Sequence, residues 1–382
     1  AESHGVPAVP GFRPDSDAVD AATFAAAADR LGYPVLVKAA AGGGGRGMRI
    51  VPRAEDLRAA LGAAEREARA AFGDGRLFLE RRLADVRHVE VQILADAHGH
   101  TAALGERECS VQRRHQKLIE ESPSPGADPA TRVKLAAAAV AVARAAGYVN
   151  AGTVEFLLAP GGRFYFLEVN TRLQVEHPVT ELVTGVDLVK AQLRIAAGET
   201  LARAGISDDG AAPRGHALEC RVCAEDPAEG FRPSPGPILV LDEPAGPGIR
   251  VDSGIREGWE VPAAYDSLLA KVIVWERTRE AAVARMEQAL RGYVILGCGT
   301  NLNFLQDVLR HAAFRRGETP TDFLERHFTG WRPAPSELAL GLAAAFAEAE
   351  TPGRRGGENG GRTRDWDPWN VGSGWRLGGG RD

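Results

Sequence analysis

The sequence predicts an α+β protein built from antiparallel strands and amphipathic helices. Segments such as RLFLERRL (76–83) and RHVEVQILAD (87–96) alternate apolar and polar residues, which is the period of half-buried strands. Residues 152–170 form two further runs of this kind around a Pro-Gly-Gly turn, which predicts a hairpin. Residues 128–147 have the spacing of a helix that begins at a capping residue and ends at glycine.

Each remaining element is predicted from its own local signals. The helix at 128–147 has Asp128 as its cap and Pro129 at its first position. The N-terminal part should hold a helix at 17–32 that ends at Gly32, strands at 33–38 and 48–51, and a helix at 54–73. The C-terminal part should hold a helix at 187–199, a boundary at 203–214, short strands, a helix at 279–291 and a flexible Gly/Arg-rich segment at 351–365.

Length and composition limit the class of protein. A chain of 382 residues accommodates two or three domains, and 44% hydrophobic with 25% charged residues is typical of globular proteins. The net charge of −5 argues against nucleic acid or a membrane surface as a partner. No apolar run is long enough to span a membrane, so we expect a cytoplasmic protein.

The cysteines do not predict a metal or redox centre. Cys220 and Cys223 form a lone C-x-x-C, and Cys109 and Cys298 lie far from it in the sequence. A second pair with suitable spacing would be needed for a zinc site. Buried strand cysteines in a reducing compartment are the better interpretation.

The predicted hairpin at 152–170 suggests a metal site. A turn centred on Gly161 and Gly162 sets Glu155 directly opposite Glu168 and puts Asn170 one diagonal step away. Facing carboxylates repel, and a divalent cation between them removes the repulsion. Carboxylate and amide oxygens favour Mg²⁺ or Mn²⁺. The alternative is that one glutamate points to solvent or pairs with an arginine.

The polar alternation continues beyond the hairpin and predicts that the strand extends to residue 176. One face of this stretch carries Glu168, Asn170, Arg172, Gln174 and Glu176. A solvated outer face would also alternate. The order of metal-type ligands, an anion-binding guanidinium and a possible base instead favours a small anion held beside metal-bound phosphates.

The segment KAAAGGGGRGM (38–48) predicts a phosphate-binding flap. It lacks the G-K-[ST] of a Walker loop, and strands are expected on both sides of it. Backbone N–H groups of such a loop fold over phosphates, and Lys38 supplies positive charge. A basic cluster of Arg113, Arg114, His115 and Lys117 is alone typical of a solvated face. Beside a flap and a metal site, it is interpreted as a nucleotide-facing strip.

These motifs together resemble the biotin carboxylases, which are ATP-grasp enzymes. The likeness covers residues 1 to about 325 and rests on a set of specific segments: KAAAGGGGRGM, RHVEVQIL, ERECSVQRRHQK, AGTVEFL, FLEVNTRLQVEHPVTE, ALECRVCAEDP and YDSLLAKVI. The resemblance implies an ATP-grasp fold, with a glycine-loop lid and an antiparallel-sheet core, followed by a biotin carboxylase C-terminal α+β domain. The implied boundaries are 1–85 for the lid, 86–206 for the core, 207–328 for the C-terminal domain and 329–382 for a linker and the start of a further domain.

The resemblance also implies roles for individual residues. The ATP phosphates would be bound by Lys38 and the loop with Gly43, Gly44, Gly45, Arg46 and Gly47. The adenine and nucleoside would be bound by Glu80, Arg81, Leu83, His88, Gln112 and His115. The Mg²⁺ ligands would be Glu155, Glu168 and Asn170. The bicarbonate pocket would be formed by Arg172, Gln174 and Val175, with Lys117 at the phosphates and bicarbonate. Glu176 would be the general base, and Arg221 would stabilise the biotin enolate.

The implied chemistry has two stages. ATP phosphorylates bicarbonate to carboxyphosphate, which decomposes to CO₂ and phosphate in a closed site. The ureido nitrogen of biotin then loses a proton and attacks the CO₂, while Arg221 stabilises the charge on the ureido oxygen. Biotin would arrive on a biotin carboxyl carrier domain, a carboxyltransferase subunit would use the product on an acyl-CoA, and a homo-oligomer is expected.

The chain departs from the family pattern at several places. Ala41 replaces the first loop glycine, and Arg81 replaces a lysine of the adenine hinge. In the family, an N-terminal domain and a second ATP-binding lysine precede the segment that corresponds to residue 1. The tail DPWNVGSGWRL resembles the segment that follows the carboxylase domain in the α chains of acyl-CoA carboxylases. Two alternatives therefore stay open: a different ATP-grasp ligase, and a truncated fragment that binds ATP without turnover.

Overall fold

The computed structural model of the protein describes residues 1–14, 20–41, 48–207, 210–334, 341 and 344–345. The chain divides into one unit at Ala1–Pro333 and a second at Ala334–Asp382. The glycine loop Gly42–Gly47, the Gly/Arg-rich segment 351–365 and the tryptophan-containing tail lie outside the described residues. Within the part that is described, no helix is both long and apolar enough to cross a lipid bilayer.

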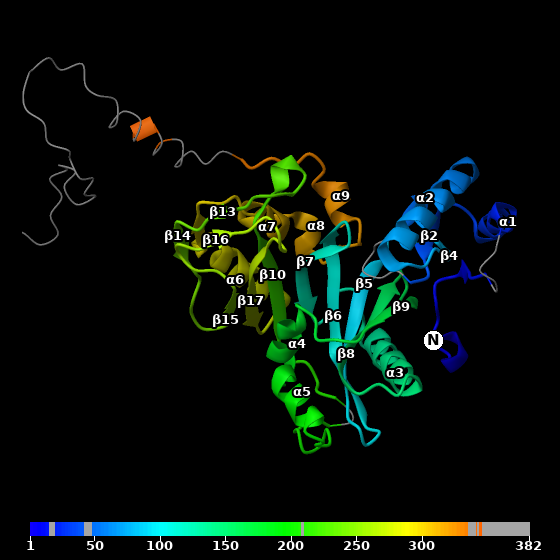
Figure 1. Ribbon diagram of the computed structural model, residues 1–382. Helices are drawn as coiled ribbons and strands as arrows, with labels where there is room; N and C mark the ends of the chain where they lie inside the picture. The colour runs from blue at the N-terminus through cyan, green and yellow to red at the C-terminus, as the bar shows by residue number, and fades with distance from the viewer. Residues whose placement is uncertain (15–19, 42–47, 208–209, 335–340, 342–343, 346–382) are drawn as a thin grey trace, which may run out of the picture. The chain divides into compact units, whose positions relative to one another are not determined.

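A small antiparallel sheet forms the N-terminal part of the first unit (Figure 1). Its strand order is β1 (Gly11–Phe12), β4 (Leu77–Arg81), β2 (Val35–Ala39) and β3 (Arg49–Val51). Helices α1 (Ala21–Leu31) and α2 (Ala54–Phe72) share a hydrophobic core with these strands. The helix predicted from residue 17 begins at Ala21, because the Asp20 side chain accepts a hydrogen bond from Thr23 N–H and caps it there.

A second, eight-stranded antiparallel sheet forms the centre of the first unit. Its order is β15 (Ile249–Ser253), β17 (Leu268–Glu276), β10 (His216–Cys223), β7 (Gln116–Ser122), β6 (Thr101–Arg113), β5 (Arg87–Ala95), β8 (Asn150–Leu158) and β9 (Phe164–Asn170). Strand β10 pairs directly with β7, so Ala217 lies opposite Ser122. The sheet therefore continues across the predicted boundary near residue 206.

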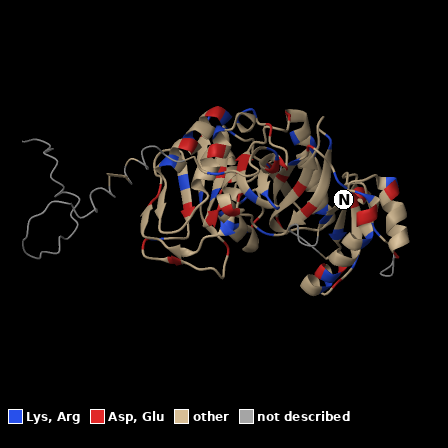
Figure 2. Ribbon diagram, turned by 90° about the horizontal axis from the view of Figure 1, so that it is seen from above, with Lys and Arg blue, Asp and Glu red and all other residues tan. Residues whose placement is uncertain are grey.

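Helices cover both faces of this sheet. On one face, α3 (Pro129–Ala145) packs on β5 and β8, and α6 (Arg279–Gly292) with α7 (Leu302–Arg310) packs on β10 and β17. On the other, Val179 and Val183 of α4 (His177–Thr184) contact Ala217 and Ile273, and α5 (Leu188–Ala196) covers the far end. Figure 2 shows positive and negative residues interspersed along strands and helices.

Short elements complete the C-terminal part of the first unit. Three two-stranded sheets pair β11 (Glu225–Asp226) with β12 (Arg232–Pro233), β13 (Gly236–Pro237) with β16 (Glu260–Val261), and β14 (Val240–Asp242) with β18 (Val294–Leu296). Among the described residues, this part also holds helices α8 (Ala312–Arg315) and α9 (Phe323–His327) and the 3-10 turn η2 (Pro227–Glu229), while the 3-10 turn η1 (Glu2–His4) lies at the N-terminus. Cys220 and Cys223 are buried, free thiols of β10, as predicted.

The hairpin of β8 and β9 has the predicted register at its two glutamates, but its turn is longer than predicted. Glu155 lies opposite Glu168, but nearer the turn Phe156 pairs with Phe166, so a bulge separates the two registers. The loop closes through a 2.7 Å hydrogen bond from Ala159 N–H to the Arg163 carbonyl, with Gly161 and Gly162 at positive φ. The loop is one residue longer than a two-residue turn, and the bulge compensates for that residue.

The prediction that the strand extends to residue 176 is wrong. Strand β9 ends at Asn170, and residues 171–176 form an irregular segment whose last residue, Glu176, is the N-cap position of α4. Pro178 in the first turn of α4 favours a helix start at this point, because its fixed φ suits the first turn of a helix. We call residues 171–176 the β9–α4 segment.

A buried ion pair joins three elements of the central sheet region. Both oxygens of Glu121 on β7 accept hydrogen bonds from Arg279 of α6, at 2.6 and 3.0 Å, and His216 of β10 lies 2.7 Å away. Burial would raise the pKa of Glu121, but the hydrogen bond with His216 and the charge of Arg279 lower it to about 2.

We predict that Glu121→Gln lowers the free energy of unfolding at pH 7 by about 3 kcal/mol, because it leaves the Arg279 charge buried and unpaired. The folded-state pKa lies below the unfolded value, so this stabilisation is present above about pH 5 and is lost as the pH falls toward 2. Urea unfolding of both proteins between about pH 3 and about pH 8 measures the difference in the free energy of unfolding. A difference independent of pH over that range would contradict this role for Glu121.

Candidate active site

One face of the central strands carries a buried layer of charged and polar side chains. Along β5, Val89, Val91 and Ile93 contact the apolar core beneath α3. The alternate residues His88, Glu90 and Gln92 therefore point to the opposite face, and all three are buried. Glu90 lies directly opposite Glu155 of β8, so two glutamates meet on this face.

The ammonium group of Lys117 lies among three carboxylates. Its Nζ is 2.5 Å from Glu90 Oε2, 2.6 Å from Glu176 Oε1 and 3.0 Å from Glu155 Oε1. Burial alone would lower the pKa of Lys117, but the charges of the surrounding acids raise it well above its ordinary value. Lys117 is thus a permanent cation at the centre of this face.

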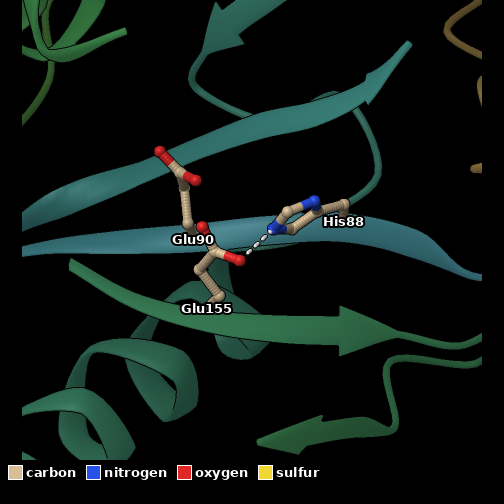
Figure 3. Close-up of side chains that lie close together, drawn as sticks. All are labelled: His88, Glu90 and Glu155. Carbon is tan, nitrogen blue, oxygen red and sulfur yellow. Dashed lines mark hydrogen bonds and ion pairs between the residues drawn. The ribbon is translucent and has the colours of Figure 1, made fainter. Parts of the chain in front are cut away.

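Glu155 is held as an anion by four donors. Oε1 accepts from Lys117, from Asn170 Nδ2 at 2.9 Å and from Gln174 Nε2 at 2.9 Å. His88 Nε2 lies 2.9 Å from the other oxygen, as the dashed line in Figure 3 shows. Burial would raise the pKa of Glu155, but His88 and Lys117 bring it well below its ordinary range.

Arg107 ties this layer together, and sequence reasoning missed it. The side chain is fully buried and donates five hydrogen bonds. Its partners lie on four different parts of the chain: Glu90 at 2.6 Å, Gln92 at 2.8 Å, Thr180 at 3.0 Å, Thr153 at 3.1 Å and Gln174 at 3.2 Å. Arg107 therefore positions the β9–α4 segment against β5 and β8. The one available signal was an arginine between two glutamates in ERECS.

Glu176 lies between two cations. Oε1 accepts from Lys117 and Oε2 accepts from Arg221 Nη2 at 2.9 Å. Burial would raise the pKa of Glu176, but Lys117 and Arg221 lower it well below its ordinary range. Arg221 Nε in turn donates to Glu120 Oε1 at 2.6 Å. The predicted residues Lys117, Glu176 and Arg221 are thus brought together.

Lys271 of β17 also reaches the β9–α4 segment and was not predicted. Its Nζ donates to the Val175 carbonyl at 2.5 Å and lies 3.4 Å from Asp252. The backbone of this segment is therefore held from β17, while its Gln174 side chain is held by Arg107. Of the other residues predicted there, Arg172 is exposed and bonds only to the neighbouring Leu173 carbonyl among the described residues.

The proposed metal ligands lie together and suit a divalent cation. Glu168 faces Glu155 across the ladder and makes no hydrogen bond or ion pair to another described residue. Asn170 lies beside Glu155, to which it donates. Two carboxylates and an amide oxygen are the hard oxygen donors that Mg²⁺ prefers. The residues therefore fit the group, and their role as ligands stays a prediction.

The residues predicted at the nucleotide lie on the small sheet and the adjoining strands. Lys38 Nζ is 3.0 Å from Glu80 on the neighbouring strand, and Arg81 Nε donates to the Leu31 carbonyl. Burial is the main cause that lowers the pKa of His115. The charges of His88 and Lys38 lower it further, and the charge of Glu325 opposes them.

The remaining nucleotide residues have local contacts or lie outside the described part. Leu83 is half-buried, and Gln112 Nε2 donates to the Cys109 carbonyl at 3.5 Å. Gly43, Gly44, Gly45, Arg46 and Gly47 lie outside the described residues.

The basic cluster at 113–117 is divided by a turn. Arg114 and His115 have positive φ between β6 and β7. Arg113 packs on the Phe231 ring at 4.6 Å and pairs with Glu225, while Lys117 points into the buried layer. The cluster is therefore not one continuous strip.

Two family models match the chain. Residues 1–204 match the carbamoyl-phosphate synthase L chain, ATP binding domain, and residues 219–326 match the biotin carboxylase C-terminal domain. The chain is 48% identical to a pyruvate carboxylase subunit of Methanothermobacter thermautotrophicus over 326 residues, covering 85% of this chain and 65% of the relative. It is 47% identical to the biotin carboxylase of Nostoc over 325 residues, covering 84% of this chain and 71% of the relative.

Longer relatives and solved structures give the same result. The chain is 44% identical to the alpha chain of the mitochondrial methylcrotonoyl-CoA carboxylase of Rattus norvegicus over 336 residues, which are 88% of this chain and 46% of that protein. The biotin carboxylase domain of Hydrogenobacter thermophilus 2-oxoglutarate carboxylase was solved as a dimer with MgADP, ADP and bicarbonate. It superposes with a TM-score of 0.82 at 43% identity, covering 87% of this chain and 73% of that one. The chain thus spans less than two thirds of several relatives.

We predict that Arg107→Lys lowers the free energy of unfolding by about 3 kcal/mol, because a lysine cannot make the five bonds and leaves buried acceptors unpaired. Arg49→Lys is the matched control, since Arg49 pairs with Glu67 at the surface and its loss should cost under about 1 kcal/mol. Urea unfolding at pH 7 measures both variants. Equal effects of the two substitutions would refute the positioning role of Arg107.

Proposed function

Because the chain belongs to the biotin carboxylase family, we propose that it carboxylates biotin with bicarbonate in a reaction driven by ATP and Mg²⁺ or Mn²⁺. The observation that carries the proposal is Glu176 held between Lys117 and Arg221, at 2.6 and 2.9 Å, beside the facing pair Glu155 and Glu168. A carboxylate base between two cations is suited to an anionic substrate that must lose a proton.

Bicarbonate would bind at the β9–α4 segment. Gln174 and the backbone of Val175 are held in place by Arg107 and Lys271, and Arg172 is exposed and available for an anion. Glu176 is ionised at neutral pH. It can therefore accept the proton of bicarbonate while an oxygen of bicarbonate attacks the γ-phosphoryl group of ATP. Lys117 would stabilise the negative charge of the transferring group and of carboxyphosphate.

The nucleotide would bind between the small sheet and the charged layer. Lys38 and the loop Gly42–Gly47 would contact the phosphates and exclude water. Glu80, Arg81 and Leu83 would hold the adenine, with His88, Gln112 and His115 near the nucleoside. Glu155, Glu168 and Asn170 would hold Mg²⁺, which when bound neutralises phosphate charge.

Arg221 would receive biotin. Two of its three nitrogens donate to Glu120 and Glu176, and no described residue accepts from Nη1. That group is available to the ureido oxygen of biotin, where negative charge develops when the ring nitrogen loses its proton. Arg221 would thus place a positive charge beside the ureido oxygen of biotin.

The partners follow from the same reaction. Biotin would arrive on a carrier domain, and a carboxyltransferase would transfer the carboxyl group to an acyl-CoA of the acetyl, propionyl or methylcrotonyl type. We further propose that the protein is a homo-oligomer in the cytoplasm. Its domains would be a lid at 1–85, a core at 86–206, a C-terminal domain at 207–328 and a following segment at 329–382. Two relatives support a carboxylase assembly by their names, since one is part of a pyruvate carboxylase and the other is the alpha chain of a methylcrotonoyl-CoA carboxylase.

Two other functions stay distinguishable. The match of residues 1–204 to an ATP binding domain of carbamoyl-phosphate synthase favours a second candidate, an ATP-grasp ligase with an amine acceptor. Such an enzyme would respond to ammonia or an amine and not to biotin. An ATP-binding chain without turnover would be stabilised by Mg-ATP and form no ADP with any acceptor.

We predict that Glu176→Gln lowers the rate of biotin carboxylation by about 10²–10⁴-fold, because the general base is lost, while ATP affinity is little changed. Incorporation of labelled bicarbonate into biotin and calorimetric titration with ATP measure the two effects. Glu181→Gln is the control, since Glu181 lies on the same helix and pairs with Arg250. Turnover by Glu176→Gln at the rate of this control would exclude Glu176 as the base.

We predict that Glu168→Gln raises the Mg²⁺ concentration needed for half-maximal nucleotide binding at least about tenfold, because one carboxylate ligand becomes neutral. Titration of nucleotide binding against Mg²⁺ at fixed ATP measures the shift. An unchanged Mg²⁺ dependence would place the metal away from the β8–β9 hairpin.

A further inference from the structure

Two fully buried glutamates lie opposite each other beneath Arg221. Glu120 on β7 and Glu219 on β10 are direct partners in the strand ladder, and both side chains are 0% exposed. Like charges directly opposite each other on paired strands repel. Neither residue was singled out by the sequence, and the mechanism above gives Glu219 no role.

The hydrogen bonds of this pair are incomplete. Glu120 Oε1 accepts from Arg221 Nε, but Glu120 Oε2 and both oxygens of Glu219 have no hydrogen-bond partner among the described residues. Lys271, whose charge lowers the pKa of Glu219, donates to the Val175 carbonyl and pairs with Asp252 instead. An ionised carboxylate that is fully buried and receives no hydrogen bond is very unfavourable.

Charged and titratable groups face the pair from every element packed on it. They are Lys117 on β7, Arg221 on β10, Lys271 on β17, Cys109 on β6 and Glu176 at the start of α4. Among these, Lys117 and Arg221 already donate to Glu176. The cations here are thus shared by several acids.

We propose that Glu120 and Glu219 hold one proton between them, with Glu219 O–H donating to Glu120 Oε2, so that the pair carries a single negative charge beneath Arg221. This bond gives a partner to one orphaned oxygen on each residue. The proton sharing rests on burial, strand register and the unpaired oxygens. The consequence for catalysis rests on the proposed function: a pair with one negative charge neutralises Arg221 less than two carboxylates would, so Arg221 can stabilise the biotin enolate.

The direction of titration agrees with this geometry. Burial and the neighbouring charge of Glu120 raise the pKa of Glu219 well above its ordinary value. Burial, opposed by the charge of Arg221, raises the pKa of Glu120 to about 7. The adjacent Glu121 is equally buried but fully paired, and its pKa is lowered, so burial alone does not protonate an acid here.

Infrared spectroscopy of the full chain at pH 7 tests the shared proton. The wild-type protein should show the C=O band of a protonated carboxylic acid. Glu219→Gln should lose this band, because its amide N–H donates to Glu120 Oε2 in place of the proton, and Glu120→Gln should lose it as well. Glu121→Gln, which removes a buried but ionised acid, should retain it. Absence of any band that Glu219→Gln removes would overturn the proposal.

The pH dependence of unfolding tests it independently. An acid protonated only in the folded state makes unfolding release a proton, so the wild-type unfolding constant should rise relative to that of Glu219→Gln by about tenfold per pH unit above the ordinary glutamate range. Parallel curves for the two proteins from pH 5 to 7 would contradict the shared proton. Circular dichroism of Glu219→Gln checks that it folds, and Glu120→Gln serves if it does not.

The catalytic consequence has its own readout. Biotin-dependent ADP release by the wild-type chain should fall at alkaline pH as the pair loses its proton, and Glu219→Gln should keep its rate where the wild type declines. Identical pH profiles would reject the effect on Arg221. If the wild-type chain shows no biotin dependence, the proposed function fails, and the infrared and unfolding results still decide whether the proton is shared.

Discussion

Neutralising charge on a buried sheet face is the constraint on which this structure depends. Lys117 lies within 3.0 Å of three carboxylates, and each of those carboxylates comes from a different part of the chain. Removing any one of these groups from water is costly unless its partners are already in place. The strand order that puts β7, β6, β5 and β8 side by side brings the partners together. The fold therefore specifies the site by requiring that its charges be paired.

The same constraint links the two segments that match separate family models. Residues of the first segment supply Lys117, Glu155 and Glu176, whereas Arg221 and Lys271 come from the second. Because β10 pairs with β7, these cations lie on the same face as the acids they contact. The proposed base, the proposed bicarbonate segment and the cation proposed for biotin thus share one sheet, which suits a reaction in which a small intermediate passes between two substrates without meeting water.

Sequence reasoning succeeded where local pattern determines structure. Helix ends at Gly32 and Asp128, the opposition of Glu155 and Glu168, and the buried strand cysteines all follow from short-range rules. It failed in the β9–α4 segment, where polar and apolar residues still alternate but the strand expected to reach Glu176 stops at Asn170. Arg107, Lys271 and Glu219 were missed because periodicity does not reveal which strands become neighbours. The metal site and the phosphate flap were predicted from local pattern and the other catalytic and binding roles from family resemblance, and all of these roles stay predictions.

We propose that this face couples bicarbonate phosphorylation to carboxylation of biotin. The most direct test is ADP release from Mg-ATP by this chain, measured with and without bicarbonate and with and without free biotin. We expect release that requires bicarbonate and is stimulated by biotin. Release that biotin leaves unchanged and that an amine acceptor stimulates instead would contradict it.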